Sequence, residues 1–522
     1  MKAKIPKEIK DIGEALKKAR FKAYLVGGCV RDILFAQMGG SRINADLDAD
    51  KRGKFLGPKD WDIATDAKPE EIQKIFLDSV YENTFGTVAV KIDSENPSLR
   101  IVEITTFRLE GRYTDKRHPD EIKFAKTIEE DLSRRDFTIN AMALDLTDNQ
   151  QQAANNSSNL LAVSGKPELI DPYDGQKDLK EKLIRAVGEP GERFNEDALR
   201  LMRAVRLATQ LNFKLEEKTE KAIKKNRGLL EFIAKERIRD EFIKLIMSKE
   251  AHKGIFLMQK LGLLKYIIPE LEEGVGVGQN KHHIFTVFEH NVKSLEYAAS
   301  KIFPLDVRVA SLLHDVGKPK TKKGNGPNST FYGHQVVGER MALRILDRLR
   351  FPKKMIEKIA LLVREHMFIY DPETVTLAGV RRLLKRVGKE NIDDLFKVRE
   401  ADRIGSGVPK AQPYRLRHLK AMVEKVQKNP ISPSMLKIKG DAVMEILKIP
   451  PGPRVGKVLA VLLEEILDDP KGNIENNLKK RVRELGKLSI KELDALSEKA
   501  KRKAAKTQER IDEEIKRKYF VR

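Results

Sequence analysis

The sequence predicts a multidomain chain with an α/β head followed by all-α domains. Its 522 residues are enough for roughly three or four domains of ordinary size. The N-terminal third combines short strand-like runs with helical segments, whereas from about Leu179 onward apolar residues recur with the helical period almost without a break. With 40% hydrophobic residues the chain can build real cores. One mixed domain followed by a string of helical units is therefore expected.

The head begins with a strand, a turn and a helix. The apolar run FKAYLV, residues 21–26, precedes Gly27 and Gly28, after which helical spacing follows. The charged, glycine-rich residues 37–59 indicate a surface insertion, and the polar segment 148–167 indicates a loop. Further strand-like alternation predicts strands at Val88–Ile92, Ile101–Thr106 and Phe137–Leu146.

Composition and periodicity also predict the domain boundaries. Residues 405–435, rich in Pro, Lys and Arg, are expected to be a linker, and the Lys/Glu-rich end from Ser489 onward a solvated helix. The sequence assigns no role to the 37–59 insertion or to this C-terminal segment. The expected domains are a head at 1–170, a helical neck at 171–275, a third helical domain at 276–410 and a basic helical tail at 411–522.

The charge of the chain indicates a polyanionic partner. Lys and Arg exceed Asp and Glu by 23 (101 against 78), and neutralising phosphates releases counterions. A basic surface kept for solubility is the alternative. The single cysteine, Cys29, excludes intramolecular disulfides and a thiolate zinc finger. Since no apolar run approaches ~20 residues and the N-terminus lacks the apolar core of a signal peptide, no membrane partner and a cytoplasmic location are expected.

Two aspartates in KDWDIAT are candidate metal ligands. Asp60 and Asp62 are two residues apart, so on an extended strand both carboxylates emerge on one face. Hard divalent cations prefer oxygen ligands, and two Mg²⁺ ions ~3.5–4 Å apart stabilise the attacking and leaving oxygens of phosphoryl transfer. The same spacing is also common in turns and solvated strands, so the surroundings decide between these interpretations.

The surroundings of the aspartate pair favour a phosphate site. In LVGGCVRD, residues 25–32, Gly27 and Gly28 let backbone N–H groups approach a phosphate at a helix N-terminus. Arg31, early in the same helix, can reach that phosphate. Glu103 in the expected strand VEITT is either a third acidic group of the site or an exposed strand residue.

Four motifs resemble, in order, those of one enzyme family. LVGGCVRD, DWDIAT, VEITTFR and RRDFTINAMA are similar to the successive head motifs of polymerase-β-like nucleotidyltransferases, and more narrowly to those of bacterial-type (class II) tRNA nucleotidyltransferases and poly(A) polymerases. The resemblance runs over residues 20–275 and implies that Asp60 and Asp62 are catalytic and bind Mg²⁺. It also implies nucleotide binding by Gly27, Gly28, Arg31, Arg134, Arg135, Asp136, Asn140, Asp197, Arg200 and Arg203.

The segment GERFNEDALRLMRAVRLA contains a candidate for base selection. With Asn195 as the N-cap of a helix, Asp197 and Arg200 fall at i and i+3 on one face. A carboxylate accepts from the exocyclic amine of cytosine or adenine and a guanidinium donates to the adjacent ring nitrogen, whereas guanine and uracil present the opposite pattern. The family resemblance implies this use of an EDxxR motif, in which Glu196 receives no role here. A surface salt bridge is the alternative interpretation.

A loop motif bears on which nucleotides are added. The stretch FRLEGRYTDKRHP, residues 107–119, resembles the flexible loop that accompanies the change from C to A addition in the family. Enzymes that add only CC are expected to lack this loop, so its presence predicts A addition without separating a full CCA enzyme from one that adds only the final A. The residues that fit its pattern are Arg112, Tyr113, Asp115 and Arg117.

A second set of candidate metal ligands lies between residues 283 and 402. Adjacent His314 and Asp315 on an apolar helix are costly to bury unless something coordinates them, and this donor pair suits transition metals such as Ni²⁺, Mn²⁺, Co²⁺ or Fe²⁺. The set resembles an HD phosphohydrolase, which implies phosphatase or 2′,3′-cyclic phosphodiesterase activity and Lys318 facing a substrate phosphate. The matching residues are His290, His314, Asp315 and Asp402, with His334 and His366 where some HD proteins bind a second metal.

These patterns predict template-independent addition of CCA to tRNA 3′ ends from CTP and ATP. A basic set in the tail either grips tRNA or decorates a packed helical module; its members are Lys437, Lys439, Arg454 and Lys457. The rival functions are a poly(A) polymerase, an enzyme that adds only A, and an HD phosphohydrolase with an inactive head. The oligomeric state is not predicted.

Overall fold

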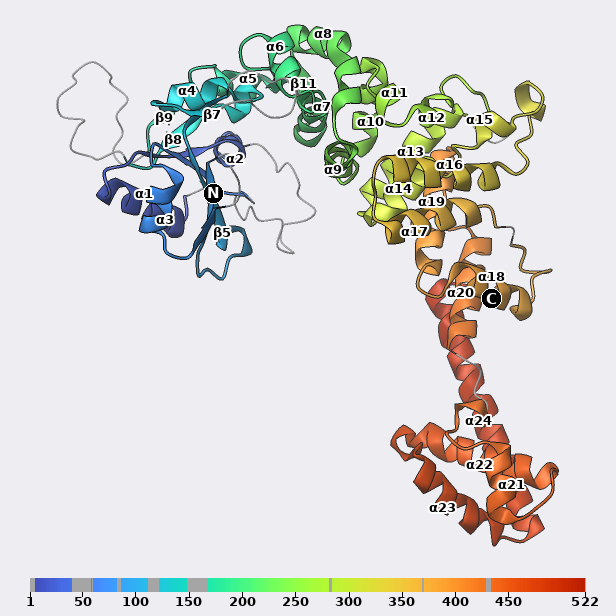
Figure 1. The fold of residues 1–522 in the computed structure, drawn as a ribbon. Coiled ribbons are helices and arrows are strands. Elements are labelled where there is room, and N and C mark those ends of the chain that lie inside the picture. Colours follow the sequence, from blue (N-terminus) through green and yellow to red (C-terminus); the bar gives the residue numbers. More distant parts are fainter. Residues whose placement is uncertain are drawn as a thin grey trace. The chain divides into compact units, whose positions relative to one another are not determined.

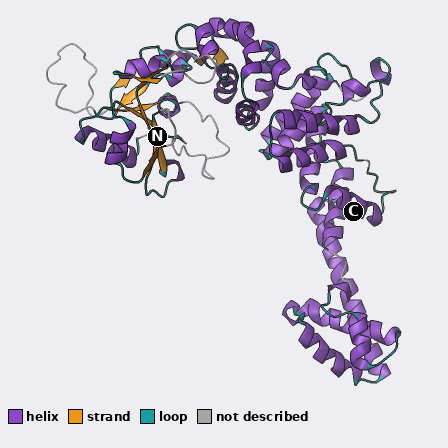
Figure 2. Ribbon diagram, in the orientation of Figure 1, coloured by secondary structure: helices purple, strands orange, loops and turns teal. Residues whose placement is uncertain are grey.

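The chain divides into two compact units in the computed structural model. Unit 1 comprises Met1–His366 and Lys397–Pro409, and unit 2 comprises Met367–Phe396 and Lys410–Arg522. The predicted fold class is confirmed: among the described residues, the named strands all lie between residues 23 and 215, and helices dominate after that point (Figures 1 and 2). The structure describes residues 5–39, 58, 60–81, 86–110, 122–147, 167–280, 284–368, 370–428 and 433–521.

The unit division and the sequence-based boundaries treat one segment differently. Residues 367–396 belong to unit 2, whereas the sequence-based boundaries place them within 276–410; the division into four domains stays a prediction. Over the described ranges, no helix combines the length and the apolar character that crossing a membrane requires.

The head is built on a mixed sheet, seven-stranded over the described residues, with the order β3-β4-β5-β2-β1-β8-β9. Strand β2 is parallel to β5 and antiparallel to β1, which is in turn antiparallel to β8. The middle of the sheet is therefore formed by strands that follow or contain the candidate site motifs. The strands are β1 (Ala23–Val26), β2 (Asp62–Thr65), β3 (Ser79–Tyr81), β4 (Thr87–Lys91), β5 (Ile101–Thr106), β8 (Ala143–Asp145) and β9 (Leu169–Ile170).

One predicted strand is wrong over its first half. Residues Thr138–Asn140 form a 3₁₀ turn, and within Phe137–Leu146 only β8 joins the sheet. Every residue from 136 to 143 is buried, so this run has no solvent-facing side for a strand to present. The Thr138 hydroxyl donates to Asp178 Oδ2 at 2.6 Å, which holds the turn against a neighbouring helix.

Helices of the head and neck cover this sheet and continue the chain. α1 buries Ile9, Ile12 and Leu16 at helical spacing and packs against β1. In the neck, α7 packs against both α9 and α10. The helices are α1 (Lys7–Lys18), α2 (Gly28–Gln37), α3 (Pro69–Ile75), α4 (Ile128–Ser133), α5 (Gly175–Glu181), α6 (Pro190–Glu196), α7 (Arg200–Leu211), α8 (Glu217–Asn226), α9 (Lys235–Ile246), α10 (Ala251–Leu261), α11 (Leu264–Ile267) and α12 (Pro269–Glu272).

The last part of unit 1 is a helical bundle in which α14 packs against α13 and α17, and α16 against α17. Gly317 is required for close approach, because a Cβ there would lie 2.6 Å from the backbone N of Gly338 in α16. The bundle consists of α13 (Val287–Ser300), α14 (Leu305–Leu313), α15 (Lys318–Thr321), α16 (His334–Arg348), α17 (Lys353–Glu365) and α19 (Ile392–Gly405), whose residues from Lys397 onward belong to unit 1.

The helices of unit 2 include one where the sequence predicted a linker. The predicted linker 405–435 is wrong, because it contains the helix α20, which buries Leu416, Leu419 and Val423. The C-terminal segment is a single helix of 30 residues, capped by Ser489 and packed against α20 and α22. Besides α20 (Tyr414–Gln427), the helices of this unit are α18 (Leu377–Val387), α21 (Gly440–Leu447), α22 (Pro453–Asp468), α23 (Glu475–Gly486) and α24 (Ile490–Tyr519).

Candidate active sites

The acidic cluster of the head lies where β2 begins. Asp62 opens this strand, and Asp60 lies in the segment that leads into it rather than on the strand itself. Glu103 of β5 is the register partner of Asp62 across the parallel pair, so the third acidic residue is a direct neighbour. Burial raises the pKa of Asp62, Arg135 opposes this, and Asp60 adds to the increase. A partly buried carboxylate beside a second carboxylate fits a divalent cation.

Gly27 allows the backbone to approach this cluster closely. It has φ 78°, a left-handed conformation that favours glycine. A Cβ at this position would lie 3.0 Å from Arg135 Nη1 and 3.4 Å from Asp62 Oδ2. The strand–turn–helix predicted from LVGGCVRD is present as β1, Gly27 and α2. Any side chain here would occupy the space between the carboxylate and the guanidinium.

A chain of polar contacts links the glycine turn with the neck. Arg31 Nη1 donates to Asn140 Oδ1 at 2.9 Å, and Asn140 Nδ2 donates to Asp136 Oδ1 at 3.2 Å. Arg203 of α7 forms an ion pair with Asp136 Oδ2 at 2.6 Å. Burial raises the pKa of Asp136, but Arg203 and the hydrogen bonds from Arg203 and Asn140 outweigh it and set the pKa at about 2. Four of the predicted nucleotide-binding residues thus belong to one network.

The two arginines of the RRD motif share one buried carboxylate. Asp131 lies 2.6 Å from Arg134 Nη2 and 3.1 Å from Arg135 Nη2. Asp131 is 1% exposed. Burial raises its pKa, but the two arginines lower the pKa below its usual value. The sequence interpretation missed this residue, although its spacing of three and four residues from the two arginines was a usable signal, since it lies in α4 and they follow directly after that helix.

The helix expected across the EDxxR motif is broken. α6 ends at Glu196 and α7 begins at Arg200, so Asp197 and Arg200 do not lie on one continuous helical face. Asn195 is not an N-cap, because it lies inside α6 and its amide donates to the Gly191 carbonyl at 2.8 Å. Asp197 adopts an extended backbone conformation, and its Oδ1 accepts from the Leu199 N–H at 3.0 Å.

Each member of the predicted base-reading pair has a charged neighbour. Arg200 Nη1 donates to Glu196 Oε2 at 2.6 Å, and its Nη2 donates to the Arg134 carbonyl at 2.9 Å. Asp197 Oδ2 accepts from Arg237 Nη2 of α9 at 2.8 Å. Glu196, to which the sequence assigned no role, therefore holds Arg200. Arg237 was not found by sequence reasoning because it lies 40 positions from Asp197 in the chain.

The predicted flexible-loop residues fall outside the described residues; they are Arg112, Tyr113, Asp115 and Arg117. On either side of them, β6 (Arg108–Glu110) and β7 (Ile122–Phe124) form an antiparallel pair. The expectation attached to this loop stays a prediction.

The second metal-ligand set converges around Asp315. Its Oδ2 lies 3.1 Å from His290 Nε2 and 3.3 Å from His314 Nε2, and its Oδ1 lies 3.2 Å from His334 Nε2 and 3.6 Å from His366 Nε2. Asp402 Oδ1 is 3.3 Å from His290 Nε2. The structure thus brings all six predicted residues together, with one carboxylate between two groups of histidines.

Backbone carbonyls orient the rings of three of the four histidines. The Nδ1 atoms of His314, His334 and His366 each face the backbone carbonyl three residues earlier, at 2.8, 2.7 and 2.7 Å. A carbonyl only accepts, so each Nδ1 carries a proton and each Nε2 faces the centre. Burial raises the pKa of Asp315, but Lys318 and His314 hold it well below its usual range. This donor set fits one or two transition-metal ions.

Lys318 is placed beside the cluster, not in solvent. Its Nζ lies 2.6 Å from Asp315 Oδ2 and donates to Gln279 Oε1 at 2.6 Å. The predicted contact with a substrate phosphate stays a prediction. In the tail, Arg454 Nη2 donates to the Gly486 carbonyl at 3.0 Å and Lys457 pairs with Asp494, so these two basic residues are engaged within unit 2.

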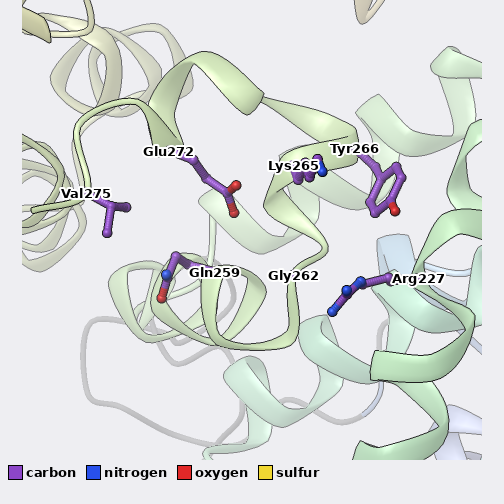
Figure 3. A pocket seen from close by; sticks show the side chains of 7 residues that line it. All are labelled: Arg227, Gln259, Gly262, Lys265, Tyr266, Glu272 and Val275. Carbon is purple, nitrogen blue, oxygen red and sulfur yellow. The ribbon is translucent and has the colours of Figure 1, made fainter.

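A pocket of about 340 Å³ in the neck lies apart from the predicted sites. Its polar side chains include two cations, Arg227 and Lys265, and one carboxylate, Glu272, whose pKa burial raises (Figure 3). Because the carboxylate offsets part of the charge of the two cations, the pocket does not indicate an anion site. It is lined by Arg227, Gln259, Gly262, Lys265, Tyr266, Glu272 and Val275.

Comparisons with known proteins cover the same segments. Three family models match: "Poly A polymerase head domain" at residues 23–185, "Probable RNA and SrmB- binding site of polymerase A" at 212–274 and "HD domain" at 282–406. An A-adding tRNA nucleotidyltransferase of Deinococcus radiodurans is 36% identical over 358 residues, which cover 66% of this chain and 76% of that protein.

Other relatives are CCA-adding enzymes. That of Ligilactobacillus salivarius is 43% identical over 50% of this chain and 55% of its own length, and that of Enterococcus faecalis is 40% identical over 52% and 58%. The match thus spans about half the length of these relatives. The crystal structure of the Bacillus stearothermophilus CCA-adding enzyme in complex with CTP is similar with a TM-score of 0.56 and 27% identity, covering 91% of this chain and 96% of that one. The chain therefore belongs to the family of tRNA nucleotidyltransferases and poly(A) polymerases, in the group that carries an HD domain, and is a nucleotidyltransferase.

Proposed function

We propose that this enzyme adds CCA to tRNA 3′ ends from CTP and ATP without a nucleic-acid template, in the maturation and repair of those ends. The observation that carries the proposal is the arrangement of Asp62, Gly27 and Arg135, in which a glycine turn leaves space between a partly buried carboxylate and a guanidinium. CCA-adding relatives at 40–44% identity and a similar structure in complex with CTP support it.

In the proposed mechanism the head residues bind and orient the reacting groups. Asp60 and Asp62 would hold Mg²⁺, and the chemistry it would supply is activation of the RNA 3′-hydroxyl and neutralisation of charge on the departing pyrophosphate. The N–H groups at Gly27 and Gly28 and the guanidinium of Arg31 receive the triphosphate. The phosphates and ribose are contacted by Arg134, Arg135 and Asp136. Asp131 holds both arginines through its two ion pairs.

Base selection is proposed to rest on Asp197 and Arg200. The carboxylate accepts from the amine of cytosine or adenine, and the guanidinium donates to the adjacent ring nitrogen. Uracil and guanine place acceptors against the carboxylate and leave polar groups unpaired, which costs about 10²-fold or more in discrimination. Glu196 keeps Arg200 in place through its 2.6 Å contact.

The HD domain is proposed to be a metal-dependent phosphohydrolase that acts on phosphomonoesters and 2′,3′-cyclic phosphates at RNA ends. Asp315 lies between two groups of histidines whose Nε2 atoms face it, which suits Ni²⁺, Mn²⁺, Co²⁺ or Fe²⁺. Lys318, whose Nζ lies 2.6 Å from Asp315 Oδ2, is proposed to pair with a substrate phosphate oxygen. Trimming damaged ends would complement adding new nucleotides.

A second candidate function is addition of the terminal A alone. The relative whose match extends over 66% of this chain is an A-adding enzyme. The two activities differ in the first end that they extend: a CCA-adding enzyme extends tRNA that lacks all three nucleotides, whereas an A-adding enzyme requires an end that already carries CC.

Substitution of the acidic pair tests the nucleotidyltransferase site. Asp62→Asn and Asp60→Asn are expected to lower incorporation of labelled CMP and AMP into tRNA by on the order of 10³-fold. Asp93→Asn, at an exposed aspartate of the head, is the matched control and should retain wild-type incorporation. Normal incorporation by Asp62→Asn would exclude the proposed site.

A further inference from the structure

Arg237 makes an end-on contact with the carboxylate that is proposed to read the base. Its Nη2 donates to Asp197 Oδ2 at 2.8 Å and its Nη1 to Asp197 Oδ1 at 3.3 Å. The same Oδ1 accepts from the Leu199 N–H at 3.0 Å. Both oxygens of Asp197 therefore have a fixed donor, although the residue lies in the non-helical turn between α6 and α7.

The element that carries Arg237 is firmly joined to the helix that carries Arg200. α9 packs against α7, and Glu241, one turn beyond Arg237, pairs with Arg206 of α7 at 2.6 Å. Glu241 is 3% exposed, so this second ion pair is buried at one end. Arg237 therefore reaches Asp197 from a rigid support.

We propose that Arg237 is a positioning residue that makes base selection strict by holding the Asp197 carboxylate in one orientation. The proposal rests on the base-reading role proposed for Asp197. A guanidinium only donates and matches a carboxylate at two points, so it fixes rotation of the side chain, which a single hydrogen bond does not. With its orientation fixed, the carboxylate presents its remaining acceptor capacity to the base.

The physical consequence concerns rejection of the wrong base. Uracil carries O4, and guanine O6, where cytosine and adenine carry an amine. A fixed carboxylate repels these oxygens, whereas a carboxylate that can turn aside removes the repulsion. Loss of Arg237 is therefore expected to relax discrimination more than it slows addition of the correct nucleotide.

The test compares CTP with UTP on a tRNA transcript that ends before CCA. Arg237→Gln is expected to lower the ratio of kcat/KM for CTP to that for UTP by about tenfold or more, with the KM for tRNA unchanged. Arg237→Lys keeps the charge but contacts the carboxylate at a single point, so it should restore part of the ratio. Arg206→Gln breaks the neighbouring α7–α9 ion pair but leaves the Arg237–Asp197 contact intact, so it measures the effect of helix packing alone and should lower the ratio much less than Arg237→Gln does.

Asp197→Asn separates failure of this inference from failure of the proposed function. If Asp197→Asn lowers the ratio and Arg237→Gln does not, Arg237 has only a structural role and the inference is wrong. If neither variant changes the ratio, the base-reading role of Asp197 fails and the inference fails with it. An equal loss in Arg206→Gln would assign the effect to helix packing. Should Arg237→Gln not fold, the partial loss expected of Arg237→Lys provides the same decision.

Discussion

Asp136 and Arg203 form an ion pair at 2.6 Å that connects the RRD motif of the head with helix α7 of the neck. Asp136 Oδ1 also accepts from Asn140 Nδ2, and Asn140 Oδ1 accepts from Arg31 Nη1. The contact thus joins residues predicted to bind the nucleotide with the helix that begins at Arg200.

Because of this ion pair, the free energy of unfolding is expected to depend on pH in the acidic range. The pKa of Asp136 is about 2 in the fold, below its usual value. A depressed carboxyl pKa contributes stability that is fully present above the unfolded-state pKa of about 4 and is lost as the pH falls through about 2. Asp136→Asn should therefore lower the free energy of unfolding by about 2 kcal/mol at pH 7 and much less at pH 2, measured by denaturant unfolding at both pH values. An equal loss at both would contradict the ionic origin.

Gly27 offers a test of the space beside the acidic cluster. Gly27→Ala places a Cβ 3.0 Å from Arg135 and 3.4 Å from Asp62 in a left-handed backbone conformation. Gly39 has the same φ of 78° but nothing within 4 Å, so Gly39→Ala is a matched control for backbone strain alone. Both variants should lose about 1 kcal/mol of stability, but only Gly27→Ala should lower kcat/KM for CTP and ATP, by about tenfold or more. Similar activities of the two variants would show that the space is not used.

Asp131 is predicted to support catalysis without touching the nucleotide. Asp131→Asn leaves Arg134 and Arg135 without their shared carboxylate. It should destabilise the protein by about 3 kcal/mol, because removing one partner of a buried ion pair leaves the other charge uncompensated. It should also raise the KM for CTP and ATP. Glu129→Gln, on the exposed side of the same helix, should change neither quantity. Thermal unfolding and steady-state kinetics measure the two effects, and an unchanged KM would limit Asp131 to a structural role.

The HD cluster predicts dependence on a transition metal. Dialysis against EDTA should lower the melting temperature by about 5 °C or more and abolish hydrolysis of a 2′,3′-cyclic phosphate, with recovery on adding Ni²⁺, Mn²⁺ or Co²⁺. Asp315→Ala should lose bound metal, measured by mass spectrometry of the metal content. Asp306→Asn, in helix α14 shortly before the His314–Asp315 pair but engaged by Lys358, should retain it. Wild-type metal content in Asp315→Ala would contradict the assignment.

The motif residues were predicted from the sequence, but the charged residues that hold their side chains in place were not. The six HD residues lie far apart in the chain, yet their residue types and order predicted a cluster that the fold assembles. Asp131, Glu196 and Arg237 were missed as supports, because which charged side chain faces which depends on tertiary packing. Arg237 in particular reaches Asp197 only through the packing of α9 on α7.

Local structure was predicted least well where tertiary contacts override composition. The break between α6 and α7 depends on the extended conformation of Asp197 and could not be read from a pattern that is helical on both sides. The helix α20, by contrast, could be recognised from the sequence, because Leu416, Leu419 and Val423 recur with the helical period. The abundant Pro, Lys and Arg around them favoured a linker instead.

The most direct test of the central claim uses three tRNA transcripts, which end before CCA, after the first C and after CC, with CTP and ATP supplied separately and together. The proposed function predicts that all three are extended to the same CCA end, with only C added when CTP is alone. Extension of the CC-ending transcript alone would establish A addition instead. A long, heterogeneous A ladder would make the protein a poly(A) polymerase, and either result would contradict CCA addition.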